Sequence, residues 1–258
     1  MSDTSPIIVS GPPRSGTTWM QWFLSQHPQI HIHGQEPQLS WSIMLSWYDR
    51  LIEAGKWGKK SNHSNDVKDY SIPHYAGSDP ERCKRIFARM AKDFLCGYGD
   101  ESKPRWGIKC LWLCTNQENV NKIKSIWPDT KWIVCIRDPF LSFESQKNTF
   151  VKDQELDSWI KRWIGSARFI EKNEGFLFQI DKLSEDAPEI RKQAVNNLLE
   201  NYIGEKPSIE TETFIDSWKR VHRVKSDKER TYHLSDKRKD EMFNKFTDLK
   251  EYMTKLGY

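Results

Sequence analysis

Residues 7–19, IIVSGPPRSGTTW, contain the features that decide the fold. The stretch begins with three β-branched residues, a run that is typical of a buried strand. Residues 10–15 are rich in Ser, Gly and Pro and predict a tight turn, and from Thr17 onward large apolar residues recur at helical spacing. A strand, a glycine-containing turn and a helix in this order direct free backbone N–H groups and the positive helix end toward an anion.

The turn also supplies side chains that suit an anion. Gly16 lets the backbone approach a phosphate closely. Arg14 adds a planar cationic donor group, and Ser15, Thr17 and Thr18 add hydroxyl groups. We therefore predict a binding site for a phosphate-type anion at this turn.

The turn differs from the loop of nucleotide triphosphatases, G-x-x-x-x-G-K-[ST], in which the Lys contacts the β- and γ-phosphates. The spacing of Gly11 and Gly16 is compatible with that loop, but Thr17 stands where the Lys would be. The cation, Arg14, precedes the second glycine. We interpret the turn as suited to one 5′-phosphate-type anion. A kinase-like enzyme that uses ATP-Mg²⁺ is the alternative, which the missing Lys disfavours.

Two motifs resemble those of sulfotransferases that use 3′-phosphoadenosine-5′-phosphosulfate (PAPS). PRSGTTW, residues 13–19, resembles their 5′-phosphosulfate loop. KWIVCIRDPFLSFES, residues 131–145, resembles their 3′-phosphate segment, a strand that ends in Arg and is followed eight residues later by Ser. The two motifs follow the family's order and have a similar separation. The resemblance implies PAPS as co-substrate, without a metal, and donor-binding roles for Arg14, Ser15, Gly16, Thr17, Thr18, Trp19, Arg137 and Ser145. Ser142 lies one turn before Ser145, so we expect both hydroxyl groups to face the anion.

Glu36 is the candidate general base. Residues 30–33 alternate between apolar and polar and predict a second strand, after which Gly34 turns the chain. In a βαβ unit this strand runs parallel to the first, so Glu36 is expected at the same edge of the sheet as the phosphate turn. Glu36 resembles the catalytic glutamate of tyrosylprotein and related sulfotransferases, which have Gly-Glu-Glu where this chain has Gly-Gln-Glu. A carboxylate that interacts with a helix N-terminus is the alternative.

Lys109 is the second catalytic candidate besides Arg14. It is the one charge in WGIKCLWL, residues 106–113, which predicts a buried strand. A charge within such a strand is costly unless it lies near the end and has a partner. Lys109 resembles the Lys that other sulfotransferases direct at the transferred sulfonate. A Lys that extends from the sheet edge to solvent is the alternative.

The remaining pattern predicts one α/β domain over residues 1–258, a three-layer sandwich with a mainly parallel central sheet and a P-loop-like sulfotransferase fold. Further helices are expected over residues 38–54, 80–96, 117–127, 156–173, 186–203 and from 236 onward, and further strands over 131–136 and 176–180.

Two segments are candidates for substrate recognition. Residues 55–78 lack periodicity and predict either a disordered stretch or an acceptor-binding loop with Trp57, His63, Tyr70, His74 and Tyr75. Residues 216–240 are strongly charged, which is typical of a solvated surface. By resemblance this is where the family folds a basic loop over the cofactor, so Lys225, Ser226, Lys228 or Arg230 would contact the 3′-phosphate.

Composition narrows the class of protein. The 258 residues carry a formal net charge of +4, which is too weak to argue for nucleic acid. No stretch approaches the roughly 18 apolar residues of a membrane span, and no leader sequence precedes the first strand, so we expect a cytoplasmic enzyme. The odd count of 5 cysteines favours buried free thiols over disulfides or zinc.

The resemblance implies that a sulfonate group moves from PAPS to an acceptor hydroxyl or amine, with Glu36, Arg14 and Lys109 as catalytic residues. The aromatic residues favour a carbohydrate or another polyhydroxylated natural product as acceptor. A non-catalytic module that binds adenosine 3′,5′-bisphosphate (PAP) is the remaining alternative. The sequence leaves the oligomeric state open.

Overall fold

A computed structural model describes residues 5–35, 43–53, 80–96, 103–149, 155–172, 174–183, 188–217 and 232–258. Its centre is a five-stranded sheet in the order β2-β3-β1-β4-β5. All the strand pairs are parallel. The strands are β1 (Ile7–Ser10), β2 (Ile30–Gln35), β3 (Arg105–Lys109), β4 (Lys131–Cys135) and β5 (Phe176–Phe178).

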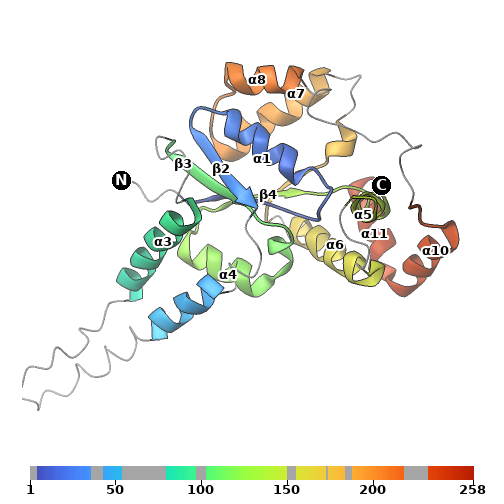
Figure 1. Cartoon of the computed structure of the whole chain (residues 1–258), viewed down its shortest axis with the longest axis horizontal. Helices are drawn as coiled ribbons and strands as arrows, with labels where there is room; N and C mark the ends of the chain where they lie inside the picture. Colours follow the sequence, from blue (N-terminus) through green and yellow to red (C-terminus); the bar gives the residue numbers. More distant parts are fainter. Residues whose placement is uncertain are drawn as a thin grey trace, which may run out of the picture.

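Helices cover both faces of this sheet (Figure 1). One face is covered by α1 (Thr17–Gln26), α7 (Pro188–Asn196), the π-helix η3 (Asn197–Ile203) and α8 (Ile209–Asp216). The other face is covered by helix 43–53, α3 (Pro80–Cys96), α4 (Gln117–Ile126), α5 (Pro139–Lys147) and α6 (Leu156–Glu171). The last two helices, α10 (Asp236–Lys245) and α11 (Thr247–Leu256), pack with this second layer. The predicted three-layer α/β architecture is confirmed.

The β-branched run at the start of the chain explains why β1 lies in the middle of the sheet. Ile7 and Val9 belong to the apolar cluster under α1, whereas Ile8 belongs to the cluster on the opposite face. All three side chains are fully buried. Strands that are buried on both faces require apolar residues at every position, and this strand has them.

The connections of β1 and β4 leave the sheet on opposite faces. The chain goes from β1 to β2 through α1 on one face, and from β4 to β5 through α5 and α6 on the other. β1 and β4 are neighbours in the sheet. Ligands of open α/β sheets bind outside the carboxyl ends of two such strands, so the fold directs attention to the segments after Ser10 and Cys135.

Three predicted elements end differently in the structure. The strand predicted over 106–113 ends at Lys109, and Trp112 adopts a left-handed backbone with φ of 63° before the 3₁₀ turn η1 (Leu113–Thr115). The helix predicted over 186–203 changes from α to π geometry after Asn196. The final helix is divided at Phe246, whose extended backbone separates α10 from α11. Apolar periodicity continues through each of these changes, which is why the pattern concealed them.

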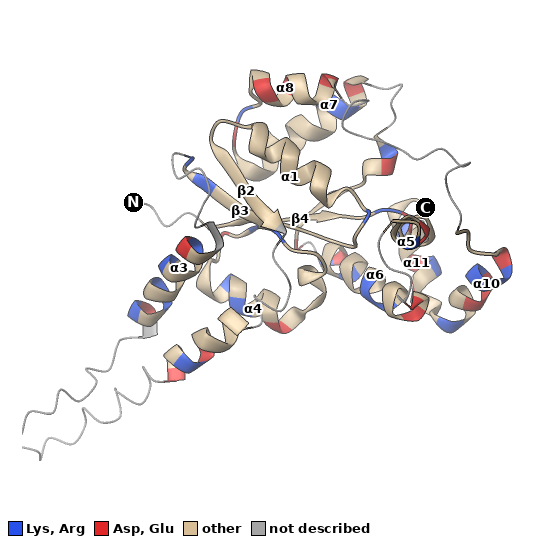
Figure 2. Ribbon diagram, in the orientation of Figure 1, with Lys and Arg blue, Asp and Glu red and all other residues tan. Residues whose placement is uncertain are grey.

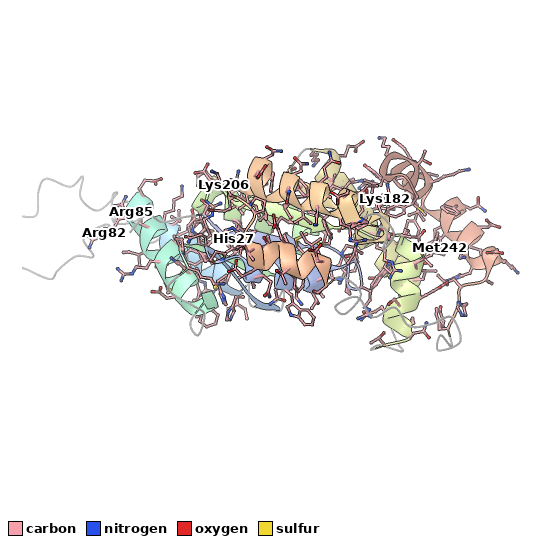
Figure 3. The ribbon with its side chains drawn as sticks, turned by 90° about the horizontal axis from the view of Figure 1, so that it is seen from above. His27, Arg82, Arg85, Lys182, Lys206 and Met242 are labelled. Atoms are coloured by element: carbon pink, nitrogen blue, oxygen red, sulfur yellow. The ribbon has the colours of Figure 1, made fainter. Side chains whose placement is uncertain are left out.

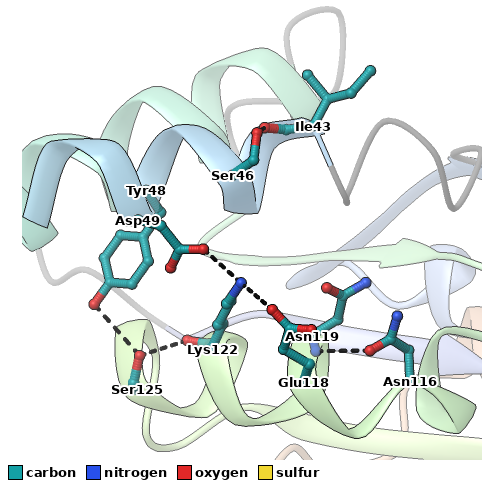
Figure 4. Close-up of polar contacts among 9 residues, drawn as sticks. All are labelled: Ile43, Ser46, Tyr48, Asp49, Asn116, Glu118, Asn119, Lys122 and Ser125. Carbon is teal, nitrogen blue, oxygen red and sulfur yellow. Dashed lines mark hydrogen bonds and ion pairs between the residues drawn. The ribbon is translucent and has the colours of Figure 1, made fainter. Parts of the chain in front are cut away.

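Charged side chains gather on the outer helices, and the strands are largely free of them (Figure 2). One group holds helix 43–53 against α4 (Figure 4): Lys122 Nζ lies 2.6 Å from Asp49 Oδ2 and 2.6 Å from Glu118 Oε1. The hydrogen bond to Asp49, followed by that to Glu118, raises the pKa of Lys122. At the start of α4 the side chain of Asn116 accepts the N–H of Asn119 at 3.1 Å, a regular N-cap.

Across the described ranges, no helix combines the length and the apolar character that a bilayer crossing needs.

Gly11→Ala tests how tightly the first turn is fixed. Gly11 has φ of 133°, and a Cβ there would lie 2.1 Å from the carbonyl oxygen of Cys135. We expect a loss of about 3 kcal/mol or more in the free energy of unfolding, because left-handed strain and a backbone clash add.

Gly204→Ala is the matched control, since Gly204 has φ of 88° and open space around it. Strain alone predicts a loss of about 1–2 kcal/mol there. Urea unfolding of both variants measures the difference, and equal losses would show that the Cys135 backbone yields to the new side chain.

Candidate active site

The turn between β1 and α1 has an unusual backbone. Gly11, Arg14 and Gly16 all have positive φ, at 133°, 64° and 92°. Gly16 is the N-cap residue of α1, and no side chain caps that helix end in the structure. Left-handed residues at three places in one short turn curl the chain sharply, and the end of α1 adds partial positive charge from its free N–H groups. This is the backbone geometry that an anion site at the turn requires.

Two of the predicted donor-binding side chains hold the turn in place. Ser15 is fully buried, and its hydroxyl contacts the carbonyl oxygens of Pro12, at 2.5 Å, and of Cys135, at 2.8 Å. The Trp19 ring is 5% exposed and stacks between Phe23 and Phe178, with centroid separations of 5.3 and 5.4 Å. The side chains of Ser15 and Trp19 thus face the core. At these two positions only the backbone N–H groups remain for an anion to bind.

A hydrogen bond joins the two motifs that the sequence analysis identified. Arg14 Nε donates to Ser145 Oγ on α5, at 3.1 Å. The two residues are 131 positions apart in the chain. The turn after β1 and the helix after β4 therefore meet at one place, outside the carboxyl ends of neighbouring strands.

The electrostatics of this place favour a bound anion. Desolvation of the guanidinium lowers the pKa of Arg14, and the charge of Arg137 lowers it further. Two guanidinium groups are thus close enough to repel each other. Such repulsion is relieved when an anion occupies the space between the cations.

Arg137 is half-buried and follows β4 directly. Its Nε is shielded from solvent and has no hydrogen-bond partner among the residues that the structure describes. A buried donor without a partner is costly, and in native proteins it usually marks a place where a ligand or water completes the bonding.

Lys109 lies at the end of β3 and is 5% exposed. Its Nζ donates to Thr18 Oγ1 in the first turn of α1, at 3.0 Å. Burial lowers the pKa of Lys109, and the nearby Cys135 thiol has a smaller opposite effect. Thr18 accepts this bond and keeps its own hydroxyl proton for a further acceptor, while Thr17 is buried beside it. The structure thus brings Lys109 to the edge of the phosphate turn.

Glu36 lies outside the described residues. The backbone nevertheless gives one relevant fact: Gln35, its predecessor in the sequence, is the register partner of Lys109 across β2 and β3. The irregularity between His33 and Gln35 interrupts the regular pairing at this point.

One expectation about α5 is wrong. Ser142 is fully buried, and its hydroxyl donates to the carbonyl oxygen of Pro139 at 3.1 Å. Only Ser145 of the predicted pair faces Arg14. The acceptor loop of residues 55–78 and the candidates Lys225, Ser226, Lys228 and Arg230 lie outside the described residues.

Sequence reasoning missed the contacts that fix the backbone around Arg137. Trp163 Nε1 on α6 donates to the Arg137 carbonyl oxygen at 2.8 Å. The Asp138 carboxylate caps α5 by accepting the N–H groups of Phe140 and Leu141, at 2.9 and 2.8 Å. Burial is the main cause that raises the pKa of Asp138. The Asp-Pro start of the helix is a local signal for the cap, whereas nothing local reveals the contact with Trp163.

The cysteines that the structure describes are buried and are not joined to one another by disulfides. Cys83, Cys110, Cys114 and Cys135 are buried free thiols, and the side chain of Cys96 is not described. Burial raises the pKa of both Cys114 and Cys135, which keeps these thiols neutral. Within the described ranges, no group of three or more His, Cys, Asp or Glu residues could hold a metal ion.

Comparison with solved structures agrees with the fold. The sulfotransferase domain of the Synechococcus PCC 7002 olefin synthase is similar over 99% of this chain and 95% of its own, with a TM-score of 0.56 at 14% identity. The sulfotransferase domain of the curacin biosynthetic pathway is similar over 99% and 98%, with a TM-score of 0.51 at 12% identity. Identities this low show a shared fold alone.

Sequence comparison carries the family assignment. Protein-tyrosine sulfotransferase A of Caenorhabditis elegans is 28% identical over 140 residues, which cover 52% of this chain and 31% of that enzyme. The chain therefore spans about a third of the length of this relative. The profile of the sulfotransferase family matches residues 6–191, which include β1 to β5 and both motifs. The chain belongs to the sulfotransferase family.

Proposed function

We propose that this sulfotransferase takes its sulfonate group from PAPS and passes it to an acceptor hydroxyl or amine. The observation that carries the proposal is the pair of cations at the carboxyl ends of β1 and β4. Arg14 and Arg137 repel each other, and Arg137 Nε is buried without a partner among the described residues. A nucleotide with phosphate groups on both sides of its ribose would satisfy both guanidinium groups.

The 5′-phosphosulfate end would lie on the turn after β1. Its backbone N–H groups, the N-terminus of α1 and the Thr18 hydroxyl would bind the oxygens. The 3′-phosphate would bind Arg137 and Ser145, because the Ser145 hydroxyl accepts from Arg14 Nε and can still donate its own proton to a phosphate oxygen. The residues present thus suit a doubly phosphorylated nucleotide.

PAPS would supply an activated sulfonate. During transfer, the bond between sulfur and the bridging phosphate oxygen breaks as a bond to the acceptor oxygen or nitrogen forms. Lys109, which is held at the edge of the turn by Thr18, would stabilise the negative charge on the leaving oxygen together with Arg14 and the turn amides. Glu36 would remove the acceptor proton. Its position in the sequence supports this role, because it follows Gln35, which pairs with Lys109 across β2 and β3.

A kinase-like reaction with ATP-Mg²⁺ is the weaker alternative. The turn has Thr17 in place of the Lys that contacts β- and γ-phosphates. Thr17 is also 3% exposed, so its side chain offers little to a triphosphate. A non-catalytic PAP-binding module is disfavoured by Lys109, because nucleotide binding alone does not require a buried cation at the sulfonate end.

We propose a carbohydrate or another polyhydroxylated natural product as acceptor, which the Trp, Tyr and His residues in the sequence of 55–78 support. Tyrosine peptides are the second candidate, supported by the 28% identity to a protein-tyrosine sulfotransferase. Turnover of labelled PAPS with oligosaccharides and with acidic tyrosine peptides would separate the two.

Arg137→Ala tests the 3′-phosphate site. We expect PAP binding to weaken by about 10- to 100-fold, because a charge-assisted hydrogen bond to phosphate contributes about 1.5–3 kcal/mol. Binding of AMP, which lacks the 3′-phosphate, should change less than 2-fold. Isothermal titration calorimetry measures both constants, and equal losses for the two nucleotides would contradict the assignment.

Glu36→Gln tests the general base. We expect turnover of PAPS to fall by a factor of about 10²–10⁴, because proton removal is lost while the shape of the side chain is kept. PAP affinity should stay within 2-fold of the wild type. Near full turnover in this variant would exclude Glu36 as the base. Loss of PAP affinity together with turnover would instead place Glu36 in donor binding.

A further inference from the structure

Three successive backbone groups around Arg137 are each held by a side chain from a distant element. The carbonyl oxygen of Ile136 accepts the Tyr258 hydroxyl at 3.2 Å, and that of Arg137 accepts Trp163 Nε1 at 2.8 Å. The N–H of Asp138 donates to Asp181 Oδ2 at 3.4 Å. The donors and acceptors come from the residues after α11, from α6, and from the 3₁₀ turn η2 (Ile180–Lys182).

Tyr258 and Asp181 also contact each other. The Tyr258 hydroxyl lies 3.2 Å from Asp181 Oδ1. The hydroxyl has one proton, so it is shared between this carboxylate and the Ile136 carbonyl. The Tyr258 ring contacts Trp163 at 6.5 Å between centroids, in edge geometry. Tyr258 thus links the side chains that hold the other two backbone groups.

The end of α11 is fixed to η2 by further bonds. The carbonyl oxygen of Leu256 accepts Gln179 Nε2 at 2.8 Å and also accepts Lys182 Nζ. Lys182 Nζ lies 5.4 Å from the centroid of the Tyr258 ring. In Figure 3 Lys182 lies in the half of the molecule that holds Met242 of α10, far from Arg82 and Arg85. These bonds limit the positions that Tyr258 can take.

The position of the backbone at residues 136–138 affects the direction of the Arg137 side chain. Its Nε has no hydrogen bond to any residue that the structure describes. The direction in which the guanidinium points therefore depends on the backbone from which the side chain leaves. A shift of that backbone by a fraction of an ångström would change the fit to a phosphate group, since bidentate Arg–phosphate contacts have narrow geometry.

We propose that Tyr258, together with Asp181, is a positioning residue that aligns Arg137 with the 3′-phosphate of the donor nucleotide. This inference rests on the proposed function. It assigns to the end of the chain, far from both sequence motifs, a part in distinguishing a 3′-phosphorylated nucleotide from one without that group.

Tyr258→Phe removes the hydroxyl and keeps the ring. We expect PAP binding to weaken about 5-fold, which corresponds to one net hydrogen bond, with AMP binding changed less than 2-fold. The matched control is Tyr252→Phe on α11, whose hydroxyl donates to Glu171 Oε2 at 2.9 Å, away from Arg137. The control should leave both affinities unchanged. Calorimetry measures the four constants.

A double-mutant cycle with Arg137→Ala separates positioning from a general loss of structure. If Tyr258 acts through Arg137, Tyr258→Phe has no further effect on PAP affinity once Arg137 is gone. A 5-fold loss that persists in that background would overturn the inference, and so would equal losses for PAP and AMP.

Asp181→Ala is a second variant in case Tyr258→Phe does not fold, because it removes the acceptor for the Asp138 N–H. It should produce the same selective loss of PAP affinity, and unchanged PAP affinity would overturn the inference. A wild-type protein that does not prefer PAP to AMP would refute the proposed function itself. A wild-type preference for PAP that survives in both variants would refute only the role of Tyr258.

Discussion

The repulsion between Arg14 and Arg137 is the constraint on which the rest of the site depends. The two guanidinium groups, which follow the neighbouring strands β1 and β4, would move apart if the chain allowed it, and hydrogen bonds on both sides prevent this. Ser15 ties the first turn to the Cys135 carbonyl, and Ser145 accepts the Arg14 Nε. The fold thus keeps two cationic side chains together, and under the proposed function this arrangement is pre-organised for the anionic donor.

The backbone strain lies in the turn beside the candidate site, whereas the buried strands stabilise the fold. β1 is fully buried on both faces, whereas the turn that follows contains three left-handed residues, of which Arg14 is not glycine. Such strain persists only where the surroundings fix it. Here the fixing groups are Cys135 next to Gly11 and Ile180 next to Gly16, which a Cβ at either glycine would contact too closely. Both groups come from the half of the sheet that also carries Arg137.

Local patterns predicted the parts of the site that depend on neighbours in sequence. The turn after β1 and the strand before Arg137 came from short segments with a clear physical meaning, whereas the eight-residue spacing from Arg137 to Ser145 came from the resemblance to a family motif. The patterns gave the type of each element well, because apolar periodicity reports burial. They misplaced the end of β3, since Trp112 and Leu113 continue the apolar run although the backbone turns. Ser142 was assigned to the site from helical spacing, but spacing does not show which way a hydroxyl points.

Contacts between distant segments could not be predicted from local sequence patterns. Nothing near Tyr258, Trp163 or Asp181 indicates that they hold the backbone on both sides of Arg137, because the partners are more than 20 positions away. For the same reason the sequence could not show that the Trp19 ring stacks on Phe178, which lies on β5. Only the three-dimensional arrangement reveals contacts of this kind.

The most direct test of the central claim is the change in melting temperature of the protein with PAP, with AMP and with ATP-Mg²⁺. A ligand at about 100 times its dissociation constant stabilises the native state by about 2.7 kcal/mol, which raises the melting temperature by roughly 5–10 °C for a chain of this size. If Arg14 and Arg137 bind two separate phosphate groups, PAP should produce this rise. AMP and ATP-Mg²⁺ at the same concentration should produce only a small rise. The largest rise with ATP-Mg²⁺, or equal rises with all three, would contradict the account.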